Sequence, residues 1–308
     1  MSREDHHMFS TIIVGVDGRQ GGRDALTLAE QLRSTGGDLF AVQAYPYEFF
    51  VSRGANADFD SVIRDDVRTE LQADLDRMGV SAQTVVVPDG SPARALHRAA
   101  ERHDAALIVV GSAHHGPLGR VLAGDVASGA LHGSPCPVVV APAGYADRTD
   151  DPGPVGVAFD GSPESRAAVG LARALAHAAK VPLRVFSVLE PSVPTGSYPS
   201  SLHDWSDGAE AVRRATTAEV AALVAELGPG TSGDVLEGDP VRELIFAGKE
   251  LGLLVCGSRS YGPLRRLMLG STSSRLVREA PFPVMVLPRG VAEAGAAEAP
   301  ATVAAHTS

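Results

Sequence analysis

The chain has 308 residues, of which 44% are hydrophobic and 21% are charged, and its formal net charge is −10. This length suits two α/β domains of average size, each long enough to bury a core of its own. The acidic balance excludes non-specific binding to nucleic acid or to an acidic membrane, because both need a basic surface. It does not exclude a nucleotide, for which a small pocket lined by amides or basic groups suffices.

The sequence favours a cytoplasmic protein. The N-terminal stretch 1–9 has no apolar signal core, and no run approaches the roughly 18 apolar residues of a membrane span. Cys136 and Cys256 lie inside apolar runs, and their spacing matches neither a metal motif nor a redox motif. We therefore expect both to be small core residues in a reducing compartment, and we expect no metal site.

Short apolar, β-branched stretches alternate with helical patterns in the first half of the chain. The stretches are almost wholly apolar, which is typical of a parallel sheet covered on both faces, and the segments between them have helical spacing. This alternation implies right-handed crossovers and a doubly wound α/β sheet. The predicted strands are 11–16, 38–45, 81–87, 106–111 and 137–141, the predicted helices are 21–34, 57–78, 92–102 and 125–132, and a glycine-rich loop occupies 111–124.

The second half repeats the first at a period of about 146 residues. Residues 109–142 and 255–288 share a GS pair, a GPL triplet and a P-x-P-V-x-V-x-P ending, and IIVGVDGR (12–19) corresponds to VGVAFDGS (155–162). A period this long indicates that a whole domain has been duplicated. We expect one domain at 8–143, a second at 154–289, a polar linker between them, and a disordered Ala/Gly/Glu-rich tail at 290–308.

Candidate ligand-binding residues gather where the strands of each copy end. In a doubly wound sheet, ligands bind beyond the carboxyl ends of the strands, at the point where the strand order reverses. Asp17 and Asp160 end the first strand of each copy, and Gly111 and Gly257 open the loop after the fourth. Asp160 is equally compatible with binding a nucleoside and with forming a turn before the next helix.

The loop at 257–274 in the second copy ends in a candidate anion site. Gly270 precedes Ser271, Thr272 and Ser273 at the predicted start of the last helix, where free amides, hydroxyls and the positive helix end meet. Arg265 and Arg266 lie in the same loop and add positive charge. The alternative is that Ser271 only caps the helix. The duplication of the whole loop favours phosphate binding.

These motifs resemble those of the ATP-binding universal stress proteins, here present in tandem. The family pattern is Gly, two residues, Gly, nine residues, Gly and then Ser or Thr, with an Asp ending the first strand. The resemblance covers residues 10–142 and 154–288, and the second copy departs from the pattern only at Ser260, which replaces the second Gly. It implies ATP-binding residues at Asp160, Val188, Gly257, Ser258, Ser260, Gly262, Gly270, Ser271, Thr272 and Ser273.

The resemblance also implies a fold and partners. Each domain is expected to be Rossmann-like, of the adenine nucleotide alpha hydrolase-like type, with a five-stranded parallel sheet of order 3-2-1-4-5. ATP, with or without Mg²⁺, is expected in the cleft at the strand ends. Fifth strands are expected to form a homodimer, or to pair with each other within the chain, because an apolar edge strand needs covering. A protein partner is also expected, but the sequence does not identify it.

The first copy departs from the family pattern at two positions. His114 replaces the second Gly, and Asp125 replaces the Ser or Thr after Gly124. The Asp125 carboxylate can itself fill the anion site, and two unit charges about 4 Å apart repel by roughly 4 kcal/mol at an effective dielectric near 20. We therefore expect the first copy to bind ATP poorly or not at all. Its degenerate site comprises Asp17, Gly111, His114, Gly116, Gly124 and Asp125.

Three functions are compatible with these observations. The first is an ATP-binding protein that regulates a stress response, the second a slow ATPase or nucleotidyl-transfer enzyme of the same fold, and the third a scaffold with vestigial pockets. Chemistry at phosphorus needs metal-binding carboxylates or a positioned base, and the second copy offers only Asp160 and Asp239. We therefore favour binding and assign no catalytic residue, while allowing slow hydrolysis or self-phosphorylation.

The substitution Asp125→Ser tests the hypothesis about the first copy. Removing the carboxylate should raise the ATP affinity of that copy, so isothermal titration of the full chain should detect an additional ATP bound at micromolar concentration. A wild-type chain that already binds two ATP molecules in the micromolar range would contradict the hypothesis.

Overall fold

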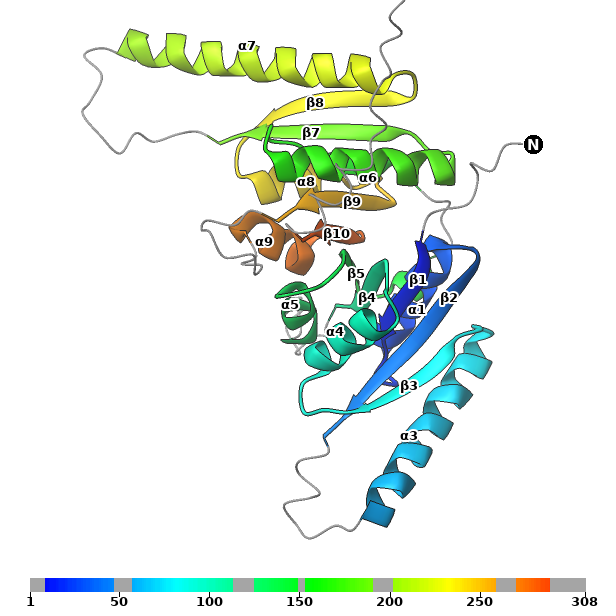
Figure 1. The fold of residues 1–308 in the computed structure, drawn as a ribbon. Helices are drawn as coiled ribbons and strands as arrows, with labels where there is room; N and C mark the ends of the chain where they lie inside the picture. The colour runs from blue at the N-terminus through cyan, green and yellow to red at the C-terminus, as the bar shows by residue number, and fades with distance from the viewer. Residues whose placement is uncertain are drawn as a thin grey trace, which may run out of the picture.

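The computed structural model describes residues 9–46, 57–112, 125–148, 153–190, 202–258 and 270–288. The chain folds into two α/β halves joined in one twisted sheet, which runs through the whole molecule (Figure 1). We call the half from β1 to β5 domain 1 and the half from β6 to β10 domain 2. The expected tail at 290–308 lies outside the described residues.

Domain 1 alternates strands and helices as the apolar pattern predicts. The main difference is at the second strand, which begins five residues early, at Arg33, and replaces the last residues of the predicted helix. Gly36 has a φ of +78°, and the pairing with the first strand shifts register between Phe9 and Thr11. The elements are β1 (Phe9–Gly15), α1 (Gln20–Leu32), β2 (Arg33–Tyr45), α3 (Ala57–Met78), β3 (Gln83–Pro88), α4 (Pro92–Arg102), β4 (Leu107–Gly111), α5 (Asp125–Leu131) and β5 (Val138–Ala141).

Domain 2 repeats this order of elements. A 3₁₀ turn, η1 (Tyr145–Asp147), lies between the two domains. The elements of domain 2 are β6 (Val155–Ala158), α6 (Pro163–Ala179), β7 (Leu183–Leu189), α7 (Leu202–Leu227), β8 (Thr231–Glu237), α8 (Pro240–Ala247), β9 (Leu253–Gly257), α9 (Ser271–Glu279) and β10 (Val284–Leu287).

The ten strands form a single sheet of order β3-β2-β1-β4-β5-β10-β9-β6-β7-β8. Each half is parallel and has the expected order 3-2-1-4-5. The halves meet where β5 pairs with β10 in antiparallel fashion, with Val140 opposite Val284 and Val138 opposite Val286. The fifth strands of the two domains therefore cover each other's edges within one chain.

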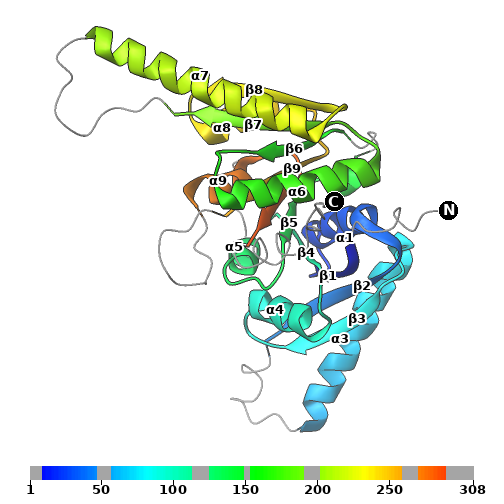
Figure 2. The same ribbon diagram turned by 45° about the horizontal axis from the view of Figure 1, so that its top comes forward.

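Helices cover both faces of the sheet and create two apolar layers that extend through both domains (Figure 2). One layer includes Leu26 of α1 and Leu175 of α6, and the other includes Leu96 of α4 and Leu244 of α8. The alternating side chains of β5 and β10 contribute to both layers, as expected for strands whose successive side chains point to opposite faces. The junction between the domains is therefore part of a continuous core.

The two cysteines belong to this core, as the sequence predicts. Cys136 and Cys256 are both buried and free. Burial raises the pKa of each thiol to about 12, so both remain protonated at neutral pH and are poor nucleophiles.

A buried carboxylate fastens the segment between the domains to domain 1. Asp24 of α1 is fully buried and accepts hydrogen bonds from the backbone N–H groups of Gly144 (3.0 Å) and Ala146 (2.9 Å). The Tyr145 hydroxyl donates to Gln31, and Arg148 donates to the carbonyl oxygen of Pro281 in domain 2. The segment is thus bonded to both domains.

Two glycines set the distance between the sheet and the helix that follows the first strand of each domain. A Cβ on Gly111, at the end of β4, would overlap the backbone of Gly21 in α1. A Cβ on Gly257, at the end of β9, would lie 2.8 Å from the carbonyl carbon of Glu164 in α6. Only a residue without a side chain fits at either position.

The substitutions Gly111→Ala and Gly257→Ala should therefore destabilise the protein. Each added methyl meets backbone rather than a flexible side chain, so we expect each to lower the free energy of unfolding by about 2–3 kcal/mol in urea denaturation.

Gly170→Ala is the control, because a Cβ at this exposed site in α6 meets nothing within 4 Å. There we expect a gain of about 1 kcal/mol from helix propensity. Equal stabilities for all three variants would show that the close approach of helix and strand is not required.

Candidate functional site

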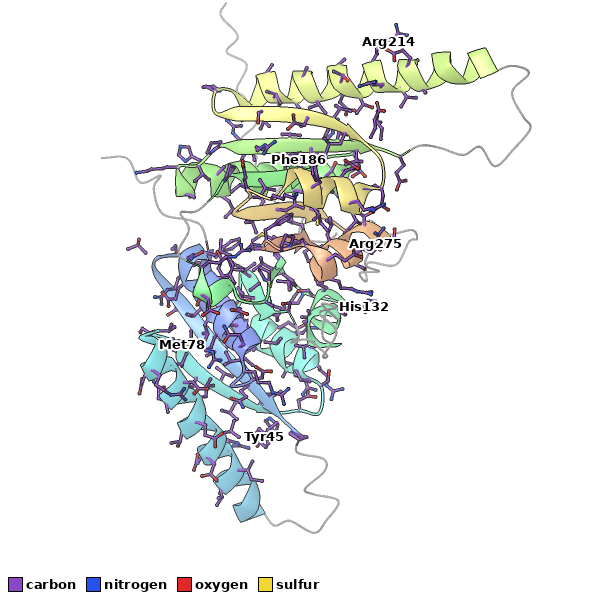
Figure 3. All side chains as sticks on the ribbon, turned by 180° about the vertical axis from the view of Figure 1, so that it is seen from behind. Tyr45, Met78, His132, Phe186, Arg214 and Arg275 are labelled. Carbon is purple, nitrogen blue, oxygen red and sulfur yellow. The ribbon has the colours of Figure 1, made fainter. Side chains whose placement is uncertain are left out.

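Domain 2 contains a cleft of about 570 Å³ at the carboxyl ends of β6, β7 and β9. The first turns of α6, α8 and α9 close its sides, and Phe186 of β7, labelled in Figure 3, is part of its wall. This is the switch point of the half-sheet, because β6 lies between β9 and β7. Seven residues expected from the sequence lie in the wall: Asp160, Val188, Gly257, Gly270, Ser271, Thr272 and Ser273.

The first turn of α9 faces this cleft without a capping side chain. Its N-cap is Gly270, so Ser271 does not cap the helix, and no described side chain accepts from the first backbone N–H groups. The Ser273 hydroxyl donates to the carbonyl oxygen of Gly270 (3.2 Å). By contrast, Ser162 caps α6 and Asp239 caps α8. The start of α9 thus keeps N–H groups available to an anion.

Asp160 has a structural role and also lines the cleft. Its Oδ1 atom accepts from the backbone N–H (3.1 Å) and the hydroxyl (2.5 Å) of Ser162. Ser162 in turn accepts from the N–H of Ser165 in α6. The turn holds the carboxylate in place at the end of β6, beside the cleft. The turn-forming role is therefore confirmed, and the binding of a nucleoside by Asp160 stays a prediction.

Ser258 and Gly257 have packing roles as well. Ser258 is fully buried, its N–H donates to the carbonyl oxygen of Leu287 (3.2 Å), and its hydroxyl has no hydrogen-bond partner among the described residues. It is not among the described residues of the cleft wall, although it follows Gly257 directly. Ser260 and Gly262, and with them Arg265 and Arg266, lie outside the described residues.

The charges around the cleft are mainly acidic. Asp160, Glu164 and Glu190 lie in the wall, and the described part of the wall contains no lysine or arginine. Glu164 and Glu190 were not predicted from the sequence, although Glu164 stands where a helix begins and Glu190 where a strand ends, which is the signal that identified Asp160.

Asp239, the other acid that the sequence offers as a metal ligand, is engaged by Arg242 and Arg275. It accepts from the N–H of Arg242 (3.0 Å) and pairs at 2.8 Å with Arg275 of α9, which is labelled in Figure 3. The hydrogen bond from Arg275 holds the pKa of the Asp239 carboxyl below its usual value. Over the described ranges, no three His, Cys, Asp or Glu side chains gather as a metal site.

Domain 1 contains a matching cleft of about 520 Å³. Asp17 and Gly111 lie in its wall, and the Asp17 carboxylate accepts from the N–H of Arg19 (3.1 Å) in the same kind of turn as Asp160. At the start of α5, however, Asp125, Val126 and Ala127 replace the three hydroxyl residues of α9. His114, Gly116 and Gly124 lie outside the described part of the chain.

Comparisons with known proteins agree with the tandem fold. The model of the universal stress protein family matches residues 8–142 and again 153–288. A universal stress protein of Mycolicibacterium smegmatis is 33% identical over 211 residues, which are 68% of this chain and 69% of that protein. One from Mycobacterium tuberculosis is 28% identical over 197 residues, 61% of this chain and 66% of that protein.

Solved structures show the same architecture. A universal stress protein from Archaeoglobus fulgidus matches with a TM-score of 0.60 and 19% identity, over 91% of this chain and 99% of that one. A functionally unknown protein from Pseudomonas aeruginosa matches with a TM-score of 0.62 and 18% identity, over 93% and 95%. At sequence identities this low, the structural similarity shows that this chain shares their fold, and nothing more. Among the described helices, none has the length and apolar character needed to cross a membrane.

Proposed function

The chain belongs to the universal stress protein family, and on that premise we propose that it binds ATP in domain 2 and acts as a regulatory protein in a stress response. The observation that carries this proposal is the uncapped first turn of α9 beside the 570 Å³ cleft. Backbone N–H groups and hydroxyls at a helix start bind phosphate, and the cleft volume lies within the range of small-molecule sites.

The lining of the cleft offers apolar groups for the base and polar groups for the phosphates. Phe186 and Val188 of β7, with Leu244 of α8, give an apolar wall for the base, and Asp160 is placed to accept from a ribose hydroxyl or an adenine amino group. Ser271, Thr272 and Ser273 provide the polar end for the phosphates. Because the described wall carries three carboxylates, we expect ATP to bind as its Mg²⁺ complex, in which the cation lowers the charge of the phosphates.

The same arrangement favours binding over turnover. Phosphoryl transfer needs a carboxylate-held metal or a base beside the reacting phosphate. Asp160 bonds to Ser162, and Asp239 bonds to Arg275 and to the first turn of α8. Neither of these two acids is placed as a dedicated metal ligand at α9. Glu164 and Glu190 also lie in the wall, but among the described residues they do not complete a group of three potential metal ligands, so we assign no catalytic residue.

The pairing of β5 with β10 affects how this chain could form a dimer. In a protein with a single such domain, two separate chains would have to pair to cover the edge of the fifth strand, whereas here the two domains of one chain cover each other's edges. We therefore propose that the chain does not use this edge for a homodimer, and that any dimer forms through another surface.

Gly270→Asp should abolish tight ATP binding. The new carboxylate would cap α9 and occupy the anion site, so the dissociation constant for Mg-ATP should rise at least about a hundredfold in isothermal titration calorimetry.

Gly270→Asn is the matched control, because it adds a side chain of the same size and capping ability without the charge. We expect it to weaken binding by no more than about tenfold. Unchanged affinity in the Asp variant would remove α9 from the phosphate site.

A second experiment separates the three functional classes. Mass spectrometry of small molecules released from purified protein should detect adenine nucleotide, and a coupled assay should show no sustained ADP release. Multiple turnovers of ATP would identify an enzyme of the same fold. Absence of bound nucleotide, together with no ATP binding on titration, would identify a scaffold.

A further inference from the structure

We propose that the cleft of domain 1 binds a nucleoside that carries no phosphate, while the cleft of domain 2 takes the triphosphate. The choice of a nucleoside rests on the proposed function, because it assumes that both copies recognise the same base. The rejection of phosphate rests on the residues of domain 1 alone.

The nucleoside half of the cleft is retained in domain 1. Three pairs of positions that correspond in the repeat line both clefts: Asp17 and Asp160, Ala44 and Val188, and Leu96 and Leu244. The two cavities also have similar volumes, about 520 and 570 Å³. The wall that would hold a base and a ribose is therefore present twice.

The phosphate half is not retained. In domain 2, Ser271, Thr272 and Ser273 all line the cleft. At the matching positions of α5, Ala127 is fully buried and Val126 presents an apolar side chain to the cleft. The remaining position is Asp125, an acid where a phosphate would need a donor. At these three positions domain 1 thus has no hydroxyl group, and the first of them is an acid in the sequence.

Among the described residues, one buried hydroxyl in the wall of the domain 1 cleft lacks a hydrogen-bond partner. Ser112 is only 3% exposed, lines the cavity, and has no hydrogen-bond partner for its Oγ atom within the described residues. Its backbone N–H donates to the carbonyl oxygen of Ala141 (2.8 Å), which fixes the residue to the sheet. Leaving such a group unsatisfied is costly, so a ligand hydroxyl or ring nitrogen that bonds to it would bind more tightly.

The polar groups beside Ser112 also suit a neutral ligand. Gln43 is half-buried and lines the cleft, and its amide can both donate to and accept from the edge of a base. Arg19 lies at the rim beside Asp17, and the opposite charges of these two side chains leave that end of the cleft with little net charge. If Arg19 instead recruited a phosphate, AMP would bind more tightly than adenosine.

The test uses one large side chain in each cleft of the full-length protein. Val188→Phe fills the cleft of domain 2, and Ala44→Phe fills the corresponding position of domain 1. In the Val188→Phe protein, calorimetric titration should show adenosine binding at least about tenfold more tightly than AMP or ATP. In the Ala44→Phe protein, this adenosine site should be lost while ATP binding is retained.

Ser112→Ala checks the same site without filling it. Removing the unpartnered hydroxyl should leave thermal stability unchanged and weaken adenosine binding to the Val188→Phe protein about tenfold. Ser258→Ala is the matched control, because this equivalent hydroxyl is equally buried and unpartnered in the described residues but is not part of the cleft wall. It should leave adenosine binding unchanged.

The inference is overturned if the Val188→Phe protein binds ATP or AMP as tightly as adenosine, or if it binds none of the three. Failure of the proposed function gives a different result, namely no ATP binding to the wild-type or Ala44→Phe protein. Retention of adenosine binding in a protein that carries both Val188→Phe and Ala44→Phe would place the nucleoside elsewhere and would also overturn the inference.

Discussion

The antiparallel pairing of β5 with β10 is the constraint on which the rest of the structure depends. It joins two parallel half-sheets, removes the apolar edge that each would otherwise expose, and lets two hydrophobic layers pass through both domains. Since α5 leads into β5 and α9 into β10, both α9 at the proposed phosphate site and its counterpart α5 in domain 1 are anchored to this shared junction (Figures 1 and 2).

The two copies agree more closely in the residues that shape the cleft than in the residues that would bind a phosphate. Gly111 and Gly257 occupy corresponding positions in the two copies, where α1 packs directly against the end of β4 and α6 against the end of β9, a requirement independent of any ligand. Asp17 and Asp160 form the same turn at the end of the first strand. By contrast, the residues that begin α5 and α9 differ in charge and in hydroxyl groups: Asp125, Val126 and Ala127 in one copy correspond to Ser271, Thr272 and Ser273 in the other.

The sequence predicted the helices and strands accurately where the local apolar pattern was strong, and less accurately where tertiary packing set the boundary of an element. The early start of β2 depends on the left-handed conformation of Gly36 and on pairing with β1, neither of which appears in an apolar pattern. In the site, a position at a strand end identified Asp160, and the family resemblance implied Val188. Neither revealed that Ser258 turns into the core rather than into the cleft wall.

By itself, the sequence determined the tandem α/β architecture, the strand order through its family resemblance, and the residues at the start of each final helix. The architecture and the helix starts follow from periodicity and repetition along the chain, whereas the strand order is what the resemblance implies. Only the tertiary structure decided that β5 pairs with β10, that Asp239 is engaged by Arg275, and that the hydroxyls of Ser112 and Ser258 lack partners in the described residues. Each of these depends on which groups from distant segments come within bonding distance, and spacing along the chain does not encode such distances.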